Sequence, residues 1–380
     1  MASKVESDGI CGMVAKTWLR FTKLPPPTPP ALPNEIIYDI LLLLPVKSLA
    51  RCRCVCREWN NLLTGSDFIK KHLDYGHHRL IVSFSKSHMS IDLEEASNFV
   101  VTNHEFPWKE HVHEIVGSCN GLLCIGLGHH HFLWNPSTRK YKQLPPHSSC
   151  FSKYNTIFYG FGYDMSIDGC YNYKVVRGER YINIGYDMRR SKVEIYTGKT
   201  DSWKRIQDIP CNINVFQERG VFVNGLLHWL ADCGSGKIIA SLNLAKEEFG
   251  EIMVPDFEKQ SLLVELGVLN GMLCVMYHNF RAWQSTWDIY AMKEYGVPDS
   301  WIQLITTPSF FGTRTMPTMP FEWTATINMP LYLMKNGELV LETTQSNILM
   351  YNPRRERLKK LIDTKFESKS IIYVESLESP

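Results

Sequence analysis

The chain has 380 residues, of which 44% are hydrophobic and 21% are charged, a composition typical of folded globular proteins. Its formal net charge is +2, so no overall field favours nucleic acid or an anionic membrane as a partner. The 11 cysteines include no C-x-x-C pair, so neither a zinc ribbon nor a thioredoxin-type motif is supported, and a reducing compartment is indicated.

Residues 1–31 are weakly patterned and end in a proline tract, Pro25-Pro26-Pro27-Thr28-Pro29-Pro30. Such a tract favours extended polyproline conformation and predicts a semi-rigid leader, with an SH3-type ligand as the functional alternative. The N-terminus lacks the apolar core of a signal peptide. The longest apolar run, Ile36 to Val46, is too short to span a bilayer. We therefore expect a soluble protein of the cytoplasm and/or nucleus, without a membrane partner.

Residues 32–73 are predicted to form three short helices. Pro33 suits the first position of the first helix, because a missing N–H needs no partner there, and Pro45 ends that helix. A second helix starts at Pro45, and Cys54 to Leu63 form the third, with Val55, Trp59 and Leu62 on one stripe. Ser66 is placed to cap a last turn.

This module has more apolar residues than three short helices can bury among themselves. Ile36, Ile37, Ile40, Leu41, Leu43 and Leu44 cover more than one face of the first helix. Because each such side chain is worth about 1.5–3 kcal/mol when fully buried, the surplus must face something. From the residues alone, a helical cap on the following domain and a docking surface for another protein remain open.

The remaining chain carries two repeated features of β structure. Asn-Gly recurs at 120–121, 224–225, 270–271 and 336–337, each time between apolar segments. This dipeptide favours a type I′ hairpin, because both of its central residues need positive φ. The second feature is a large apolar residue followed three positions later by an aliphatic one: Tyr141/Leu144, Trp203/Ile206, Phe249/Ile252, Trp301/Leu304 and Leu358/Leu361.

The repeats predict a closed ring of sheets. The first members of the five pairs differ by 62, 46, 52 and 57 residues, spacings that suit propeller blades. From Arg79 to Tyr373 there is room for about six blades of roughly 40–50 residues each. The segment IIYVESL near the end is placed to pair with the first blade and close the ring. Because the repeats supply their own core, they favour the docking surface over the cap.

The helical segment carries an ordered pattern of prolines and apolar residues, at Leu32-Pro33, Ile36, Ile40, Leu43, Pro45-Val46, Leu49, Val55-Cys56 and Trp59. In order and spacing this pattern resembles the F-box, especially that of plant F-box proteins. The resemblance implies binding to a SKP-type adaptor, which links an F-box protein to the cullin scaffold of a RING ubiquitin ligase. The matching residues are also those expected to bind the adaptor: Leu32, Pro33, Ile36, Ile40, Leu43, Pro45, Val46, Leu49, Val55, Cys56 and Trp59.

Six segments of the body form a recognisable set: FLWNPSTRKYKQLPP, GFGYDMSIDGCYNYKVVRG, KVEIYTGKTDSWKRI, VFVNGLLHWLAD, MKEYGVPDSWIQL and KNGELVLETT. Through them the body resembles the F-box-associated (FBA) domain of plant F-box/kelch-repeat proteins. No Gly-Gly pair occurs, although kelch blades characteristically carry one. The expected fold is α+β and mostly β: a leader at 1–31, a three-helix F-box at 32–73, and a kelch-like propeller of about six blades at 79–376.

No residue pattern supports catalysis, a metal site or a cofactor. Gly117 to Gly121 have the G-x-C-x-G shape of a nucleophile elbow around Cys119. A hairpin turn explains that position better, because the other three Asn-Gly copies carry no cysteine there. His129 to His131, with His111 and His113 nearby, lack a completing carboxylate or cysteine, so a solvated loop is the preferred interpretation. No nucleotide or zinc-protease motif occurs.

Three other groups are given structural roles. Cys52, Cys54 and Cys56 are interpreted as small hydrophobes on different helix faces, and the arginines between them lie either at an adaptor rim or on a solvated face. The basic run Arg354 to Lys360 is predicted to be the exposed side of an outer strand, not a nucleic-acid site. Trp203, Trp229 and Trp301 are expected in blade cores.

The sequence therefore predicts a non-catalytic substrate receptor of an SCF-type ubiquitin ligase, which recruits an unidentified target protein for ubiquitination and proteasomal degradation. One alternative is a non-ligase interaction protein, which uses the helices as a cap or binds the adaptor without assembling a ligase. A propeller enzyme is the other, opposed by the missing nucleophile or metal set. Candidate target-binding loops are Met188–Lys192, Asn279–Thr286 and Ser309–Met319.

Overall fold

The computed structural model describes residues 32–84, 87–94, 100–105, 114–128, 130–148, 155–181, 190–209, 212–213, 218–232, 237–254, 261–281, 284–308, 330–343, 347–362 and 368–380. The leader predicted for residues 1–31 lies outside these ranges. The chain divides at Leu44–Pro45 into two compact units. The first contributes helix α2 (Asn34–Leu42). The second contributes α3 (Val46–Cys52), α4 (Arg57–Thr64), α5 (Ser66–Asp74) and a β-propeller.

The described part of the helical region holds four helices, so the prediction of three was wrong. The expected last turn after residue 65 is a helix of nine residues, α5, and Gly65 caps it in place of Ser66. Pro33 is the N-cap of α2 and not its first helical residue, so the helix begins at Asn34, one residue later than predicted. The third helix starts at residue 57 and not at 54, because the Cys56 sulfur accepts a hydrogen bond from the Trp59 N–H at 3.4 Å and caps it.

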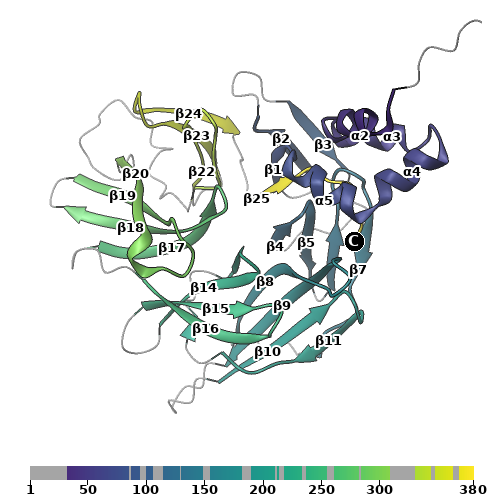
Figure 1. The fold of residues 1–380 in the computed structure, drawn as a ribbon. Coiled ribbons are helices and arrows are strands. Elements are labelled where there is room, and N and C mark those ends of the chain that lie inside the picture. Colours follow the sequence, from purple (N-terminus) through teal and green to yellow (C-terminus); the bar gives the residue numbers. More distant parts are fainter. Residues whose placement is uncertain are drawn as a thin grey trace, which may run out of the picture. The chain divides into compact units, whose positions relative to one another are not determined.

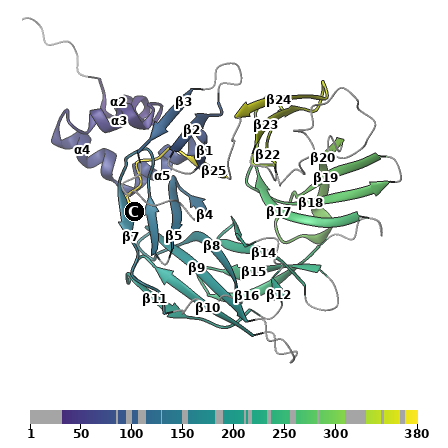
Figure 2. The ribbon, with the colours of Figure 1, turned by 180° about the vertical axis from the view of Figure 1, so that it is seen from behind.

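Six antiparallel sheets make up the described part of the propeller, which confirms the predicted blade number (Figure 1). Figure 2 shows the same sheets from behind, disposed around a common centre. Blade 1 consists of β25 (Ser368–Val374), β1 (His78–Phe84), β2 (Ser87–Asp92) and β3 (Val101–His104). Blade 2 consists of β4 (Glu114–Cys119), β5 (Leu122–Leu127), β6 (His130–Trp134) and β7 (Tyr141–Gln143).

The other four blades follow in chain order. Blade 3 consists of β8 (Asn155–Met165), β9 (Tyr171–Tyr181), β10 (Arg190–Thr197) and β11 (Ser202–Arg205). Blade 4 consists of β12 (Asn212–Ile213), β13 (Val221–Val223), β14 (Leu226–Asp232), β15 (Lys237–Asn243) and β16 (Glu248–Met253). Blade 5 consists of β17 (Ser261–Leu269), β18 (Met272–Arg281), β19 (Gln284–Met292) and β20 (Trp301–Pro308), the last preceded by a 3-10 turn at Pro298–Ser300. Blade 6 consists of β21 (Tyr332–Leu333), β22 (Leu339–Glu342), β23 (Ile348–Asn352) and β24 (Arg357–Ile362).

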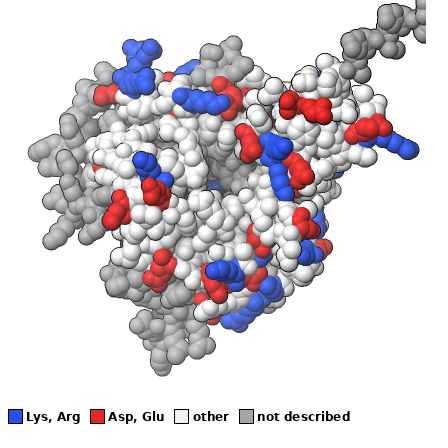
Figure 3. Space-filling view, in the orientation of Figure 1, with Lys and Arg blue, Asp and Glu red and all other residues white. Residues whose placement is uncertain are grey.

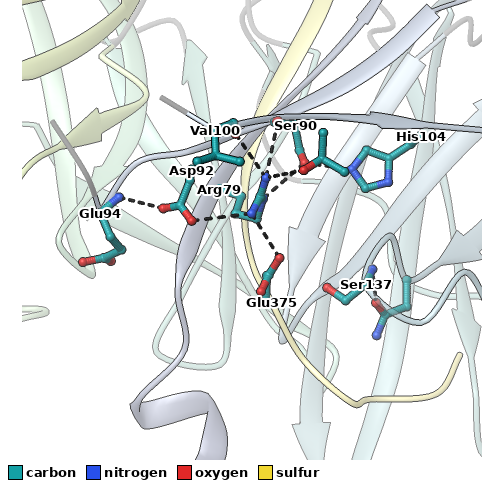
Figure 4. Close-up of polar contacts among 10 residues, drawn as sticks. Arg79, Ser90, Asp92, Glu94, Val100, His104, Ser137 and Glu375 are labelled. Atoms are coloured by element: carbon teal, nitrogen blue, oxygen red, sulfur yellow. Dashed lines mark hydrogen bonds and ion pairs between the residues drawn. The ribbon is translucent and has the colours of Figure 1, made fainter. Parts of the chain in front are cut away.

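Strand β25 closes the ring, as predicted from the segment IIYVESL. It pairs antiparallel with β1 along the whole strand, from His78↔Val374 to Phe84↔Ser368. Arg79 on β1 reinforces this pairing, because its guanidinium lies 3.3 Å from a Glu375 carboxylate oxygen and 3.5 Å from one of Asp92 (Figure 4). Closure covers the edge of β1, which would otherwise present unpaired backbone groups.

Blade 6 meets blade 1 through both apolar and charged side chains. Leu80 and Ile91 of blade 1 belong to one buried cluster with Val340 of blade 6. At its margin the Lys335 Nζ lies 2.6 Å from a Glu94 carboxylate oxygen. The junction between the first and last sheets is therefore packed and not merely juxtaposed.

Three of the four Asn-Gly pairs form the predicted type I′ turns. Asn120, Asn224 and Asn270 have φ of 49°, 51° and 50°, and the glycine after each is also positive. Each of these turns joins the inner strand of a blade to the second strand. The fourth pair differs: Gly337 has φ of 84° but Asn336 is not in the left-handed region, because a longer loop separates β21 from β22.

The predicted apolar pairs lie on or next to the outer strands. Trp203, Phe249, Trp301 and Leu358 are partly buried against the blade cores, as expected. Trp229 is fully buried. Tyr141 is the exception, with 51% of its surface exposed, and its prediction was wrong. In that blade the core is closed by Leu144, which follows the short strand β7 and is 2% exposed.

Candidate adaptor-binding surface and central channel

Helix α2 and its flanks carry an exposed apolar stripe. Leu32, Ile36, Ile40 and Leu43 are 57%, 45%, 47% and 67% exposed. Ile36, Ile40 and the C-cap Leu43 are spaced four and three residues apart, which places them on one side of the helix. Leu32 and Pro33, just before the helix, are exposed as well. A row of exposed large aliphatic side chains is costly in water, so this stripe is a candidate docking surface.

The six other residues predicted to bind an adaptor lie in the second unit and differ in burial. Pro45 and Val55 are exposed, while Cys56 and Trp59 are half-buried. Val46 and Leu49 are 1% and 0% exposed. Because they are buried, these two side chains are not available to contact a partner in this conformation.

Two of the cysteine and arginine side chains of this region make hydrogen bonds to helix backbone groups. Cys56 caps α4, and Arg53 donates from Nη2 to the Leu63 carbonyl oxygen at 2.8 Å. Arg51 and Arg57 are exposed. Within the described residues no set of three or more His, Cys, Asp or Glu side chains is placed to hold a metal ion.

Helix α5 is attached to the propeller at blade 3. The Lys70 ammonium donates to the Gly169 carbonyl oxygen in the turn between β8 and β9. The same ammonium lies 5.5 Å from the centre of the Tyr171 ring, within cation–π range. This contact holds α5 on the side of the propeller where the inner strands turn into the second strands.

The candidate nucleophile Cys119 is a core residue. It ends β4 just before the Asn-Gly turn and is 7% exposed, and burial raises the pKa of its thiol. A buried neutral thiol is a poor nucleophile. The hairpin interpretation is therefore confirmed.

The histidine triplet does not lie in a solvated loop where it is described. His130 and His131 belong to β6, and His131 is 3% exposed, with burial lowering its pKa to about 3. That prediction was wrong because β6 begins at His130, one residue before the strand-like segment HFLWN that the sequence suggested. His129, His111 and His113 lie outside the described residues.

The basic run near the end of the chain lies on the turn before β24 and on β24 itself. Arg354, Arg355, Arg357 and Lys359 are exposed, as predicted for an outer strand. Figure 3 shows Lys and Arg side chains gathered over this end of blade 6, whereas both signs are interspersed over the rest of the described face.

Target-binding loops proposed from the sequence fare unevenly. Arg190 to Lys192 are part of β10, and the described ends of the segment 279–286 belong to β18 and β19. The segment 309–319 lies outside the described residues. In the first two segments the described residues are therefore strand ends and not the loops that were predicted.

A central cavity of about 700 Å³ lies between the inner strands of the propeller. Six charged residues of its lining come from five blades: Glu114, Glu218, Arg219, Glu265, Glu342 and Lys369. Burial raises the pKa of Glu114 to about 7 and raises that of Glu342. Nothing in the sequence signalled this group, because its members lie far apart along the chain and join only when the ring forms.

Comparison with known proteins assigns the chain to a family. A family model described as F-box-like matches residues 30–74, and one described as F-box associated beta propeller domain matches residues 75–379. The chain belongs to the F-box proteins with an F-box-associated propeller. The F-box match implies binding of a SKP-type adaptor, and members of this family are non-catalytic adaptors.

Curated plant proteins resemble this F-box protein along most of its length. F-box protein CPR1 of Arabidopsis thaliana is 33% identical over 344 residues, which cover 81% of each chain. F-box/kelch-repeat protein At3g23880 of the same plant is 27% identical and covers 93% of this chain and 97% of its own. In the described residues no helix is long and apolar enough to cross a membrane.

Proposed function

We propose that this F-box protein is the substrate receptor of an SCF ubiquitin ligase. The observation that carries the proposal is the exposed apolar stripe of α2, which lies inside the segment that matches the F-box model. Leu32, Pro33, Ile36, Ile40 and Leu43 dock the SKP-type adaptor, together with Pro45, Val55, Cys56 and Trp59. Buried Val46 and Leu49 act by shaping the module.

The receptor contributes proximity and not bond chemistry. The adaptor joins it to the cullin scaffold, and the propeller holds a target protein near a charged ubiquitin-conjugating enzyme. Target lysines are thereby raised to a high effective concentration next to the thioester, which accelerates transfer without a catalytic side chain on the receptor. Ubiquitination commits the target to the proteasome.

The docking surface is tested by truncating its centre. Ile36→Ala with Ile40→Ala should weaken capture of a purified SKP-type adaptor by about thirtyfold to a thousandfold, because each apolar anchor at an interface centre contributes on the order of 1–2 kcal/mol. The matched control is Ile167→Ala with Met253→Ala, two aliphatic residues that are 106% and 68% exposed on the propeller. Equal capture by both double variants in a titration would refute this assignment.

A second candidate function is an interaction protein that binds the adaptor without assembling a ligase. The exposed apolar stripe of α2 fits this function equally well, because both functions need the adaptor to dock there. Reconstitution with adaptor, cullin, RING subunit and conjugating enzyme separates the two. Ubiquitin transfer to a protein captured by the propeller, lost in the Ile36→Ala/Ile40→Ala variant, supports the ligase. Adaptor capture without transfer supports the alternative.

A further inference from the structure

The charged residues of the central channel gather toward one of its ends. Glu114 is the first residue of β4, and Lys369 is the second of β25. Glu342 is the last residue of β22, which runs opposite to the inner strands. The other end of the inner strands carries the Asn-Gly turns, with Asn120 and Asn270 in the lining. The channel is thus polarised along its axis.

Acidic groups outnumber basic groups at the charged end. Four carboxylates, of Glu114, Glu218, Glu265 and Glu342, face the two cations Arg219 and Lys369 among the described lining residues. One hydrogen-bond donor of the Arg219 guanidinium is already engaged, because its Nη1 donates to the Ile115 carbonyl oxygen at 3.4 Å. Glu265 has a further interaction of its own, but the carboxylates of Glu114, Glu218 and Glu342 alone outnumber the two resident cations among the described lining residues.

The carboxylate of Glu342 lacks a nearby cationic side chain among the described residues. Its side chain is 6% exposed and lines the cavity, yet no cationic side chain lies within 4.0 Å of its carboxylate in the described part of the chain. The Ser370 hydroxyl, Arg219 and Lys369 favour its ionised form, but burial outweighs them and raises its pKa. A buried carboxyl without a counter-ion either keeps a proton or binds a cation from outside.

We propose that this end of the channel binds a cationic group, an ammonium or guanidinium, carried by a free polyamine or by a lysine or arginine side chain of a partner chain. The cavity of about 700 Å³ lies within the range of small-ligand sites. The inference goes beyond the ligase role and does not depend on it.

Binding of the cation is coupled to proton release. Glu114 is influenced by Arg219, Glu218 and Lys369, and burial holds its pKa at about 7. A cation in the channel supplies the missing counter-charge, so it lowers the pKa of Glu114 and Glu342 and expels protons near neutral pH. A cation held only at the molecular surface displaces no such protons.

Calorimetric titration of the full chain tests this site. Spermidine and a tetralysine peptide are the two probes, each titrated at pH 7 in PIPES and in HEPES, whose protonation heats differ. Saturable binding with proton release is expected, and Glu114→Gln with Glu342→Gln should weaken it at least about tenfold and abolish the release. The matched control is Glu248→Gln with Glu251→Gln, two exposed carboxylates on β16, which should change neither.

The two probes distinguish the sources of the cation. Binding of tetralysine alone assigns the site to a side chain of a partner, whereas binding of spermidine assigns it to a free polyamine. Lys369→Met is a second variant, with the opposite expected effect on affinity. Because it removes an exposed resident cation, it should tighten binding of the cationic probe severalfold. The proposal is overturned if neither probe binds saturably, or if binding and proton release persist in the double glutamine variant. Adaptor capture by the same variants reports separately on the ligase role.

Discussion

The side-chain amide of Asn135 donates to the Glu378 carbonyl oxygen at 2.8 Å and to the Ser376 carbonyl oxygen at 3.1 Å. The amide oxygen of the same residue accepts from the Ser137 N–H at 2.8 Å. One fully buried asparagine therefore joins the outer turn of blade 2 to the segment that follows the closing strand. Closure is secured on blade 2 as well as on blade 1.

Asn135→Asp should destabilise the propeller by about 2–4 kcal/mol, because it keeps the turn acceptor but replaces two buried donors by a charge that faces carbonyl oxygens. Asn243 makes the same turn in blade 4, where its Oδ1 accepts from the Ala245 and Lys246 N–H groups, and among the described residues its amide donates to no such segment. Asn243→Asp should change stability by about 0.5 kcal/mol or less. Urea unfolding measures both, and equal losses would show that the bonds to residues 376 and 378 add nothing.

Two glycines of equivalent turns separate backbone strain from crowding. Gly121 and Gly271 have φ of 84° and 76°, so alanine costs about 1–2 kcal/mol at either position. A Cβ on Gly271 meets no atom within 4 Å, whereas one on Gly121 would lie 2.7 Å from the Val374 carbonyl oxygen. Gly121→Ala should therefore lower the melting temperature clearly more than Gly271→Ala. Equal losses of melting temperature in the two variants would show that the chain around the end of β25 does not pack against the turn at Gly121.

The two classes of apolar residue in the helical module should respond differently to truncation. Leu49 is fully buried, so Leu49→Ala should cost about 2–5 kcal/mol of stability. Ile40 is 47% exposed, so Ile40→Ala should leave stability within about 0.5 kcal/mol but weaken adaptor binding. Thermal melting and adaptor titration at a temperature where both variants are folded provide the test. A Leu49→Ala variant that stays stable but no longer binds the adaptor would contradict the structural role assigned to Leu49.

The pH dependence of Glu114 has a defined sign. Its folded-state pKa is raised from 4.5 to about 7 by burial, so stability falls as pH rises from about 4.5 to 7 while the unfolded chain loses this proton first. Glu114→Gln should therefore stabilise the protein by on the order of 1–3 kcal/mol at pH 8. At pH 4, where both states are protonated, the gain should vanish. Urea unfolding at the two pH values, with Glu251→Gln as the exposed control, checks the difference.

Local turn chemistry explains why much of the propeller could be predicted. A type I′ turn needs positive φ at two successive residues, and Asn-Gly meets that need almost regardless of its surroundings. Asn120, Asn224 and Asn270 followed this rule. A second signal was overlooked: Asn135, Asn243 and Asn352 each precede a residue with positive φ by four positions and accept backbone N–H groups in the turn to the outer strand.

The remaining features depend on contacts that sequence spacing does not encode. In the helical module aliphatic residues cover more than one helix face, so their pattern alone does not separate buried Leu49 from exposed Leu43. In the propeller, Glu114 and Glu342 look like ordinary strand-end carboxylates. Only closure of the ring places them in one cavity and deprives them of water, which makes them chemically unusual.

Pairing of β25 with β1 imposes an order on synthesis. Residues 368–374 complete the sheet that begins at His78, so they emerge from the ribosome after every other strand of the ring. Until then the nascent chain exposes the edge of β1, a template for unwanted pairing. A message cut short before this segment would thus yield an open, aggregation-prone chain and not a smaller closed propeller.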